Sequence, residues 1–221
     1  NLYKQCYAYP WEMRIQFRWS FVYQMEVHLS KRTRYRHDTF EREVTDFIAK
    51  LTRQWTPIEP DVLSYIRKLT SLDWRAKVIP CYILKSSTAH PISDPLTIPI
   101  EVDLGARRWA ITPSRAIDIL IHEVIHVLFI ENDIVDDYFT YLIQEKYSDQ
   151  HWNTAAHVPV LAIHKAVYDR FLPPHRLRRD IRACQIYPEY KAAWDIVLAE
   201  GEENIIHELR AFVSQASVRR A

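Results

Sequence analysis

One predicted helix constrains this 221-residue chain more than any other segment. The helix begins at Thr112, because a threonine followed by Pro113 is a strong helix start, and it continues to about Ile130. Residues 119–129, with the sequence ILIHEVIHVLF, are apolar almost all round the helix, which is typical of a helix buried in a protein core. Two histidines and a glutamate interrupt this apolar surface. Ionisable side chains are costly to bury, so the segment indicates a site that uses them.

These three residues belong to the sequence HEVIH, which matches the pattern HExxH. His122 and His126 are one helical turn apart, so both imidazoles leave the same face and can bind one metal ion. Glu123 is rotated by about 100° from His122, which places its carboxylate beside a water on that ion, where it can act as a general base. Zinc is the cofactor we expect, because it takes imidazole ligands and leaves a fourth position open. The competing interpretation is that both histidines are hydrogen-bonded core residues.

Glu145 is one candidate for a third metal ligand. It follows His126 by nineteen residues and belongs to a helix expected over 133–147. On a helical wheel it falls at the margin of the apolar face, so its carboxylate could point inward. The alternative is a solvated carboxylate at the end of that helix.

His157 is the other candidate, and we favour it as the ligand. It shares one face of an apolar helix, expected over 154–172, with His164, because the two are seven residues apart. Pro159 suggests that His157 lies in the first turn of this helix. His164 would then hydrogen-bond a metal ligand or stabilise an oxyanion.

The remaining pattern predicts an α+β fold, with strands and helices first and a helical half afterwards. Every odd residue from Trp11 to Leu29 is apolar, which indicates extended structure with a bend or hairpin near Ser20. Two strands are expected, Lys77–Leu84 and Leu96–Val102, and Pro99 favours a sheet edge for the second. Helices are expected from Thr39 to Pro57, over Asp61–Leu72, and then over 113–130, 133–147, 154–172, 175–184, 188–200 and 202–215.

We expect a single domain over 1–221, in which a strand and helix region, 1–72, precedes a metal-binding catalytic core, 73–221. No linker rich in glycine, serine and proline divides the chain. Only two glycines occur, which excludes glycine-rich phosphate loops and dinucleotide-binding fingerprints. The three cysteines are far apart and form no CxxC pair, which argues against a cysteine-based zinc site.

A formal net charge of +1 indicates no general attraction to nucleic acid. The basic run His175–Arg182 includes Asp180, and we expect it to be a solvated helix face without nucleic-acid contact. No apolar run is long enough to span a membrane and no signal peptide is visible, so a soluble, cytoplasmic protein without a membrane partner is expected. The oligomeric state stays open.

The HEVIH helix, preceded by a strand that can form a sheet edge, resembles the zincin metallopeptidases over about Trp74–Arg170. The resemblance implies a small mixed sheet packed on the HExxH helix, an edge strand that binds substrate, and a later residue that completes the zinc site. Phe129 and Asn132 stand where the metzincin branch needs glycine and histidine. The position of Glu145 is similar to the gluzincin branch. The helix of His157 is similar to one in small HExxH proteins of unknown role, and SprT-like proteases also use a third histidine.

The resemblance implies a zinc-dependent metallopeptidase that acts on a peptide or protein substrate. Zinc would be held by His122, His126 and His157, and Glu123 would be the general base. Two other functions stay open, a non-catalytic zincin-like binding domain that metal stabilises and a SprT-like protease associated with DNA.

Overall fold

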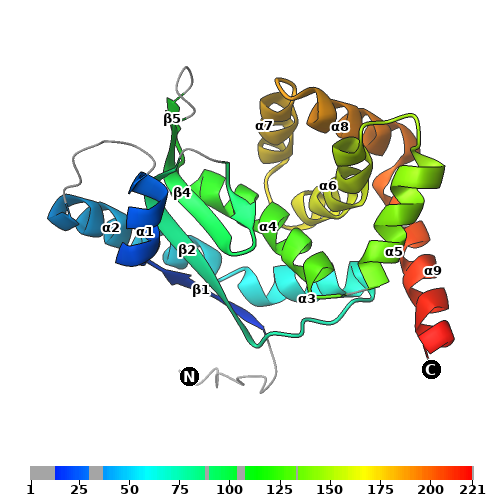
Figure 1. The fold of residues 1–221 in the computed structure, drawn as a ribbon, viewed down its shortest axis with the longest axis horizontal. Helices are drawn as coiled ribbons and strands as arrows, with labels where there is room; N and C mark the ends of the chain where they lie inside the picture. Colours follow the sequence, from blue (N-terminus) through cyan, green and yellow to red (C-terminus); the bar gives the residue numbers. More distant parts are fainter. Residues whose placement is uncertain (1–12, 30–36, 88–89, 104–107, 133, 221) are drawn as a thin grey trace, which may run out of the picture.

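A computed structural model describes residues 13–29, 37–87, 90–103, 108–132 and 134–220. Helix α4 lies between a small sheet and a group of helices (Figure 1). The strands are β1 (Arg14–Arg18), β2 (Val78–Ser87), β3 (Ile92–Ser93), β4 (Leu96–Asp103) and β5 (Arg108–Ala110). The helices are α1 (Phe21–Leu29), α2 (His37–Trp55), α3 (Glu59–Thr70), α4 (Pro113–Ile130), α5 (Ile134–Tyr141), the π-helical turn η1 (Leu142–Lys146), α6 (Trp152–Phe171), α7 (Pro174–Cys184), α8 (Pro188–Glu200) and α9 (Glu202–Arg220).

The five strands form one mixed, open sheet in the described residues, which confirms the α+β prediction. Strand β2 pairs in parallel with β1 on one side and with β4 on the other. The short strands β3 and β5 both pair antiparallel with β4, at its two ends. Because β1 pairs with β2, the region before residue 73 shares one sheet with the segment that leads to the HEVIH helix.

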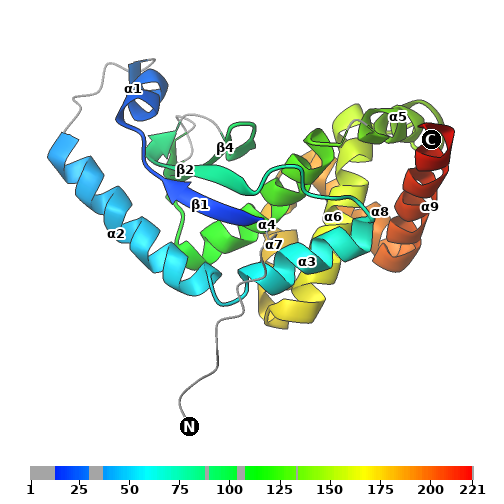
Figure 2. The same cartoon turned by 90° about the horizontal axis from the view of Figure 1, so that it is seen from below.

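The two faces of the sheet carry different helices (Figure 2). Ile79, Cys81 and Ile83 alternate along β2 and are buried on the face covered by α2 and α4. Tyr82 points to the other face, where its ring contacts Tyr23 of α1 at a centroid distance of 5.4 Å. The alternation along β2 therefore places α4 in the core on one face and α1 on the opposite one.

The prediction of extended structure over Trp11–Leu29 is wrong in its second half. Strand β1 ends at Arg18, and α1 follows where a second strand was expected. The Ser20 hydroxyl accepts a hydrogen bond from the backbone N–H of Tyr23 at 3.2 Å, which favours a helix start. The helix also buries Gln24, whose side-chain oxygen accepts from the Lys85 N–H of β2 at 2.5 Å. Trp11 lies outside the described residues, as do residues 30–36.

Strand β4 is not the open edge that the sequence suggested. Its side opposite β2 is covered by β3 at Leu96 and Thr97 and by β5 from Glu101 to Asp103. Pro99 lies between these two pairings and also faces Leu84 of β2. The Ile100 carbonyl accepts from the Ile111 N–H on the β5 side, so the nitrogen of Pro99 faces β2 and the pairing with β2 lacks one N–H donor there.

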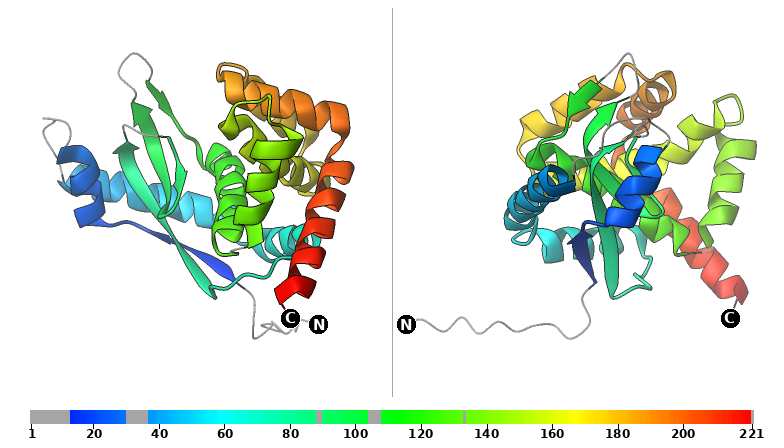
Figure 3. Two further views of the ribbon diagram at one scale, coloured as in Figure 1. Left: turned by 45° about the vertical axis from the view of Figure 1, so that its right-hand side comes forward. Right: turned by 60° about the vertical axis from the view of Figure 1, so that its left-hand side comes forward.

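The helices after residue 112 agree with prediction to within a few residues at most boundaries. Helices α5 to α9 pack beyond α4, on the side away from the sheet (Figure 3). The helix expected over 133–147 ends instead in the π-helical turn η1, and α9 extends beyond its expected end. No helix within the described ranges is long and apolar enough to cross a bilayer.

Candidate metal centre

Local sequence fixes where α4 begins and hence which way its histidines face. The Thr112 hydroxyl accepts a hydrogen bond from the Arg115 N–H at 3.2 Å, and Pro113 occupies the first turn. Leu120, Val124 and Leu128 of the same helix are fully buried. The helix is therefore held in the core, and it packs against α6 (Figure 1).

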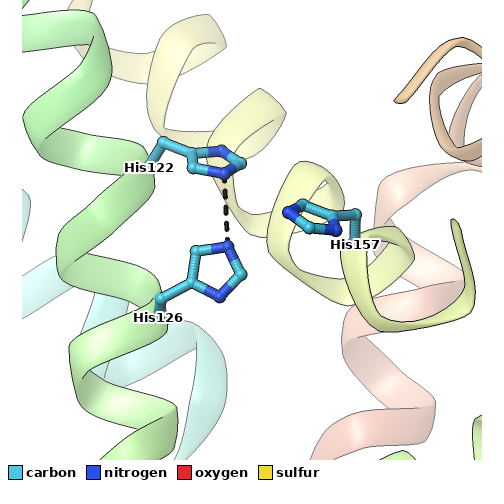
Figure 4. Close-up of side chains that lie close together, drawn as sticks. All are labelled: His122, His126 and His157. Carbon is cyan, nitrogen blue, oxygen red and sulfur yellow. Dashed lines mark hydrogen bonds between the residues drawn. The ribbon is translucent and has the colours of Figure 1, made fainter. Parts of the chain in front are cut away.

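His122, His126 and His157 come together between α4 and α6 (Figure 4). One ring nitrogen of each lies within 4.8 Å of the other two. The Nε2 atoms of His122 and His126 are 3.2 Å apart. Two nitrogens on a tetrahedral zinc ion, each at roughly 2.0–2.1 Å from it, are about 3.3 Å apart, so this pair already has the required separation.

A backbone hydrogen bond orients His157. Its Nδ1 lies 2.7 Å from the carbonyl oxygen of Asn153, one turn earlier on α6. An N–H at Nδ1 donates to this carbonyl and leaves Nε2 free as a ligand, which is how metal-binding histidines are usually held. The position of Pro159 predicted His157 in the first turn of its helix, and this prediction is wrong. Helix α6 begins at Trp152, and the proline lies inside it, where the Ala155 carbonyl lacks its usual backbone donor.

Glu145 lies apart from the three histidines. It is exposed on η1 and is not a member of the cluster, which uses the favoured candidate, His157. Its neighbour Lys146 turns inward instead, and its ammonium group contacts Glu200 at 3.0 Å and Glu208 at 2.6 Å. The π-helical turn thus directs a lysine, and not the glutamate, into the interior.

His164 lies beside the cluster without belonging to it. Its ring is 5.5 Å from that of His122, between centroids, and its side chain is 1 % exposed. Neither ring nitrogen has a hydrogen-bond partner of regular geometry in the described part of the chain. Burial lowers the pKa of His164, against the opposing charges of Asp180 and Asp118 and a weaker contribution from the Asp118 backbone carbonyl.

Glu123, the residue expected to act as a general base, is buried on α4. It is 9 % exposed, and its Oε2 accepts a hydrogen bond from the Ser93 hydroxyl at 2.9 Å. Burial raises the pKa of Glu123 to about 7, against the opposing effect of the Ser93 hydrogen bond. Ser93 could not be predicted from the sequence, because only the pairing of β3 with β4 brings it to α4.

The histidines of the cluster are neutral at neutral pH, as metal ligands must be. Burial lowers the pKa of His126 to about 3 and holds that of His122 well below its usual value. Neighbouring imidazoles add to both effects. Burial also lowers the pKa of His157, although the Asn153 carbonyl partly offsets it.

The basic run His175–Arg182 is not wholly a solvated face. Asp118 of α4 is fully buried, and its carboxylate accepts hydrogen bonds from Arg176 and Arg179 of α7. Asp180 is buried too and pairs with Arg115 of α4. Ion pairs therefore hold α7 against α4, and two arginines of the run are paired with a carboxylate of the same protein.

A cavity of about 1000 Å³ reaches the candidate site at His122 and Glu123, whereas His126 and His157 do not line it. Its walls include side chains of α4, α6, β5 and the segment from α7 to α8, among them His122, Glu123, Trp109, Leu161 and Tyr190. The ring of Tyr190 lies 4.4 Å from that of His157, between centroids. Such a cavity is large enough to enclose a small ligand or a few residues of a peptide.

These residues can hold a divalent metal ion. Three neutral imidazoles are a ligand set that suits zinc and also copper, iron and nickel, so the geometry supports a metal but does not choose among them. A carboxylate beside the set and a cavity in front of it are what metal-assisted hydrolysis requires.

Comparison with known proteins gives no match, whether to a family model, a curated protein or a solved structure. The resemblance to the zincin metallopeptidases therefore rests on the HEVIH motif and on the arrangement of these side chains.

Replacing His157 by alanine is expected to weaken zinc binding by more than the ten- to hundredfold that loss of an outer hydrogen-bond partner usually costs. The matched variant Glu145→Ala should bind zinc as the wild type does, because this carboxylate is exposed and outside the cluster. Zinc affinity measured by competition with a chromophoric chelator checks both. Loss of zinc in Glu145→Ala with retention in His157→Ala would reverse the assignment.

In the metal-free chain, the free energy of unfolding should fall as the pH drops below about 6.5. The four buried histidines have lowered pKa values in the folded state, so the unfolded chain takes up protons first and is favoured by acid. Each contributes up to about 1.4 kcal/mol per pH unit in this range. Glu123 acts in the opposite direction, since its raised pKa favours the folded state on acidification, but it is one group against four.

Urea unfolding in the presence of a chelator, at about pH 7 and about pH 5.5, measures this effect. The double variant His122→Gln/His126→Gln should lose part of the pH dependence. A wild-type stability that is unchanged or higher at the lower pH would contradict the buried, neutral state of the histidines.

Proposed function

We propose that this protein is a zinc-dependent peptidase with a zincin-like catalytic core. The observation that carries the proposal is the joint placement of three histidine nitrogens, the Glu123 carboxylate and a large cavity. A metal site that only stabilises the fold would need the histidines but neither the buried carboxylate nor the cavity. The engagement of Arg176 and Arg179 by Asp118 speaks against the alternative of a DNA-associated protease.

His122, His126 and His157 would hold the metal. A zinc ion there would supply Lewis acidity, polarising the substrate carbonyl and lowering the pKa of a water molecule to about 7. The Asn153 carbonyl fixes the His157 ring, and the 3.2 Å separation on α4 is already suited to binding. The two histidines of α4 would thus need little rearrangement to bind the ion.

Glu123 would move the proton in this reaction. Its carboxylate takes a proton from the attacking water, whose oxygen forms a bond to the carbonyl carbon of the peptide. As the C–N bond breaks, Glu123 passes that proton to the leaving amine nitrogen. A pKa of about 7 suits both transfers, and the Ser93 hydroxyl holds one carboxylate oxygen in place.

Within the described part of the chain, no strand pairs with the edge of β5 that lies opposite β4, and this supports a peptide as the substrate. The Ile111 N–H bonds to the Ile100 carbonyl at 2.7 Å, so Trp109 is the next residue along that pairs with β4. The N–H and C=O groups of Arg108 and Ala110 therefore point to the opposite edge. Trp109 and Arg108 line the cavity, so an extended peptide could pair with β5 at its mouth.

The variant Glu123→Gln should lose about 10²- to 10⁴-fold in peptide hydrolysis and keep its zinc, because an amide cannot accept the proton. Cleavage of an internally quenched peptide library by the zinc-loaded chain, with zinc content measured alongside, checks this. Glu145→Gln, the same change at an exposed position, should keep full activity. The proposal fails if the zinc-loaded wild type cleaves no peptide, or if Glu123→Gln is fully active.

A further inference from the structure

A row of aromatic rings lines one wall of the cavity. Between centroids, the ring of His90 lies 6.0 Å from that of Trp109 on β5 and 5.3 Å from that of Tyr187. Tyr190, 6.2 Å from Tyr187, continues this aromatic row to the ring of His157. The four rings before His157 belong to the cavity wall, and each is partly or largely exposed. They come from separate segments of the chain, so only the fold brings them together.

The surroundings of the aromatic row suit an apolar group. Burial lowers the pKa of His90, so its imidazole is neutral at neutral pH. Ile186, the sequence neighbour of Tyr187, is 57 % exposed and lies in the same wall. Several charged side chains of the wall are already paired within the protein, namely Arg108 with Glu101, Arg115 with Asp180 and Asp118 with Arg176. Aromatic and apolar side chains left exposed in a cavity are typical of a site that binds an apolar ligand group.

The register of β5 directs the indole of Trp109 to the cavity side of the sheet. Trp109 pairs with Val102 of β4, and residues directly opposite each other in a sheet point to the same face. Val102 is fully buried on the face that α4 covers. The outward N–H and C=O groups of β5 belong to Arg108 and Ala110, so an antiparallel peptide would place a non-hydrogen-bonded residue opposite Trp109. Side chains approach most closely in such pairs.

We propose that the aromatic row binds an aromatic side chain of the peptide substrate, that of the residue opposite Trp109. Aromatic rings that meet across neighbouring strands, or edge to face, attract each other beyond the effect of apolar burial. Hydrogen bonds along β5 would then give affinity, and the aromatic row would give specificity. This inference rests on the proposed function, because it places a peptide along β5 at the metal centre.

Saturation-transfer NMR of the peptide acetyl-Gly-Gly-Phe-Gly-Gly-amide with the full Glu123→Gln chain tests this contact without hydrolysis. The same peptide with alanine in place of phenylalanine is the matched probe. The phenylalanine peptide should bind about tenfold more tightly, and its ring protons should receive the most saturation. Trp109→Ala in this chain should remove the difference between the peptides. Trp109→Phe, the conservative change, should keep phenylalanine binding to within about threefold.

Two further variants separate a local contact from a loss of structure. Trp152→Ala makes the same change at a tryptophan that is 60 % exposed and is not part of the cavity wall, so binding of both peptides should be unchanged. His90→Ala removes an exposed ring of the aromatic row and puts the fold at less risk than a change in β5. It should weaken binding of the phenylalanine peptide alone, by about threefold, and it decides the question if Trp109→Ala does not fold.

Equal binding of the two peptides would overturn the assignment. So would a preference for phenylalanine that survives both Trp109→Ala and His90→Ala, or one that disappears in Trp152→Ala. Cleavage tests the proposed function separately. If the zinc-loaded wild type cleaves no peptide while the Glu123→Gln chain prefers phenylalanine, the peptidase is wrong and the aromatic row stands as a peptide-binding site.

Discussion

The contact between α4 and α6 is the constraint on which the rest of the candidate site depends. Both helices are apolar over most of their surface, and histidines of both lie where the two helices face each other. The ring of His157 contacts those of His122 and His126, whereas His164, two turns later, reaches only His122 of this pair. The two helices therefore run in opposite directions. Burial makes the imidazoles neutral, and neutral imidazoles crowded together are a metal-binding set.

The surrounding structure fixes that contact from both ends. On one side, the strands bring Ser93 to Glu123, so the sheet supplies the partner of the candidate base. On the other, the buried carboxylate of Asp118 holds α7 through Arg176 and Arg179. Removing one member of such a network would leave an unpaired charge in the core, which is far more costly than the pair is favourable. The walls of the cavity are thus set by electrostatics as much as by apolar packing.

The parts that were predictable from sequence are those that local chemistry decides. Thr112 and Pro113 mark the start of α4, and the one-turn spacing of His122 and His126 determines that they share a face. Sequence alone is a weaker guide to the choice of His157 over Glu145. Helical periodicity tells which face of a helix each residue is on, but not which other helix or strand that face packs against. Only the packing of α6 on α4 brings His157 to the other two histidines, and only the turn η1 leaves Glu145 exposed.

Long-range pairing and helix capping explain what the sequence did not reveal. Alternating apolar residues up to Leu29 imitate a strand, yet the Ser20 cap and the buried Gln24 make α1 a helix. Ser93 reaches Glu123 only because the two-residue strand β3 pairs with β4. The edge strand that lines the cavity is likewise β5, a three-residue strand that periodicity cannot detect.

X-ray absorption at the zinc K-edge of the zinc-loaded chain tests the central claim most directly. The account predicts a four-coordinate ion with three imidazole nitrogens at about 2.0–2.1 Å and one further light atom from solvent. Sulfur at about 2.3 Å, fewer than three imidazole ligands, or no stably bound zinc would contradict it.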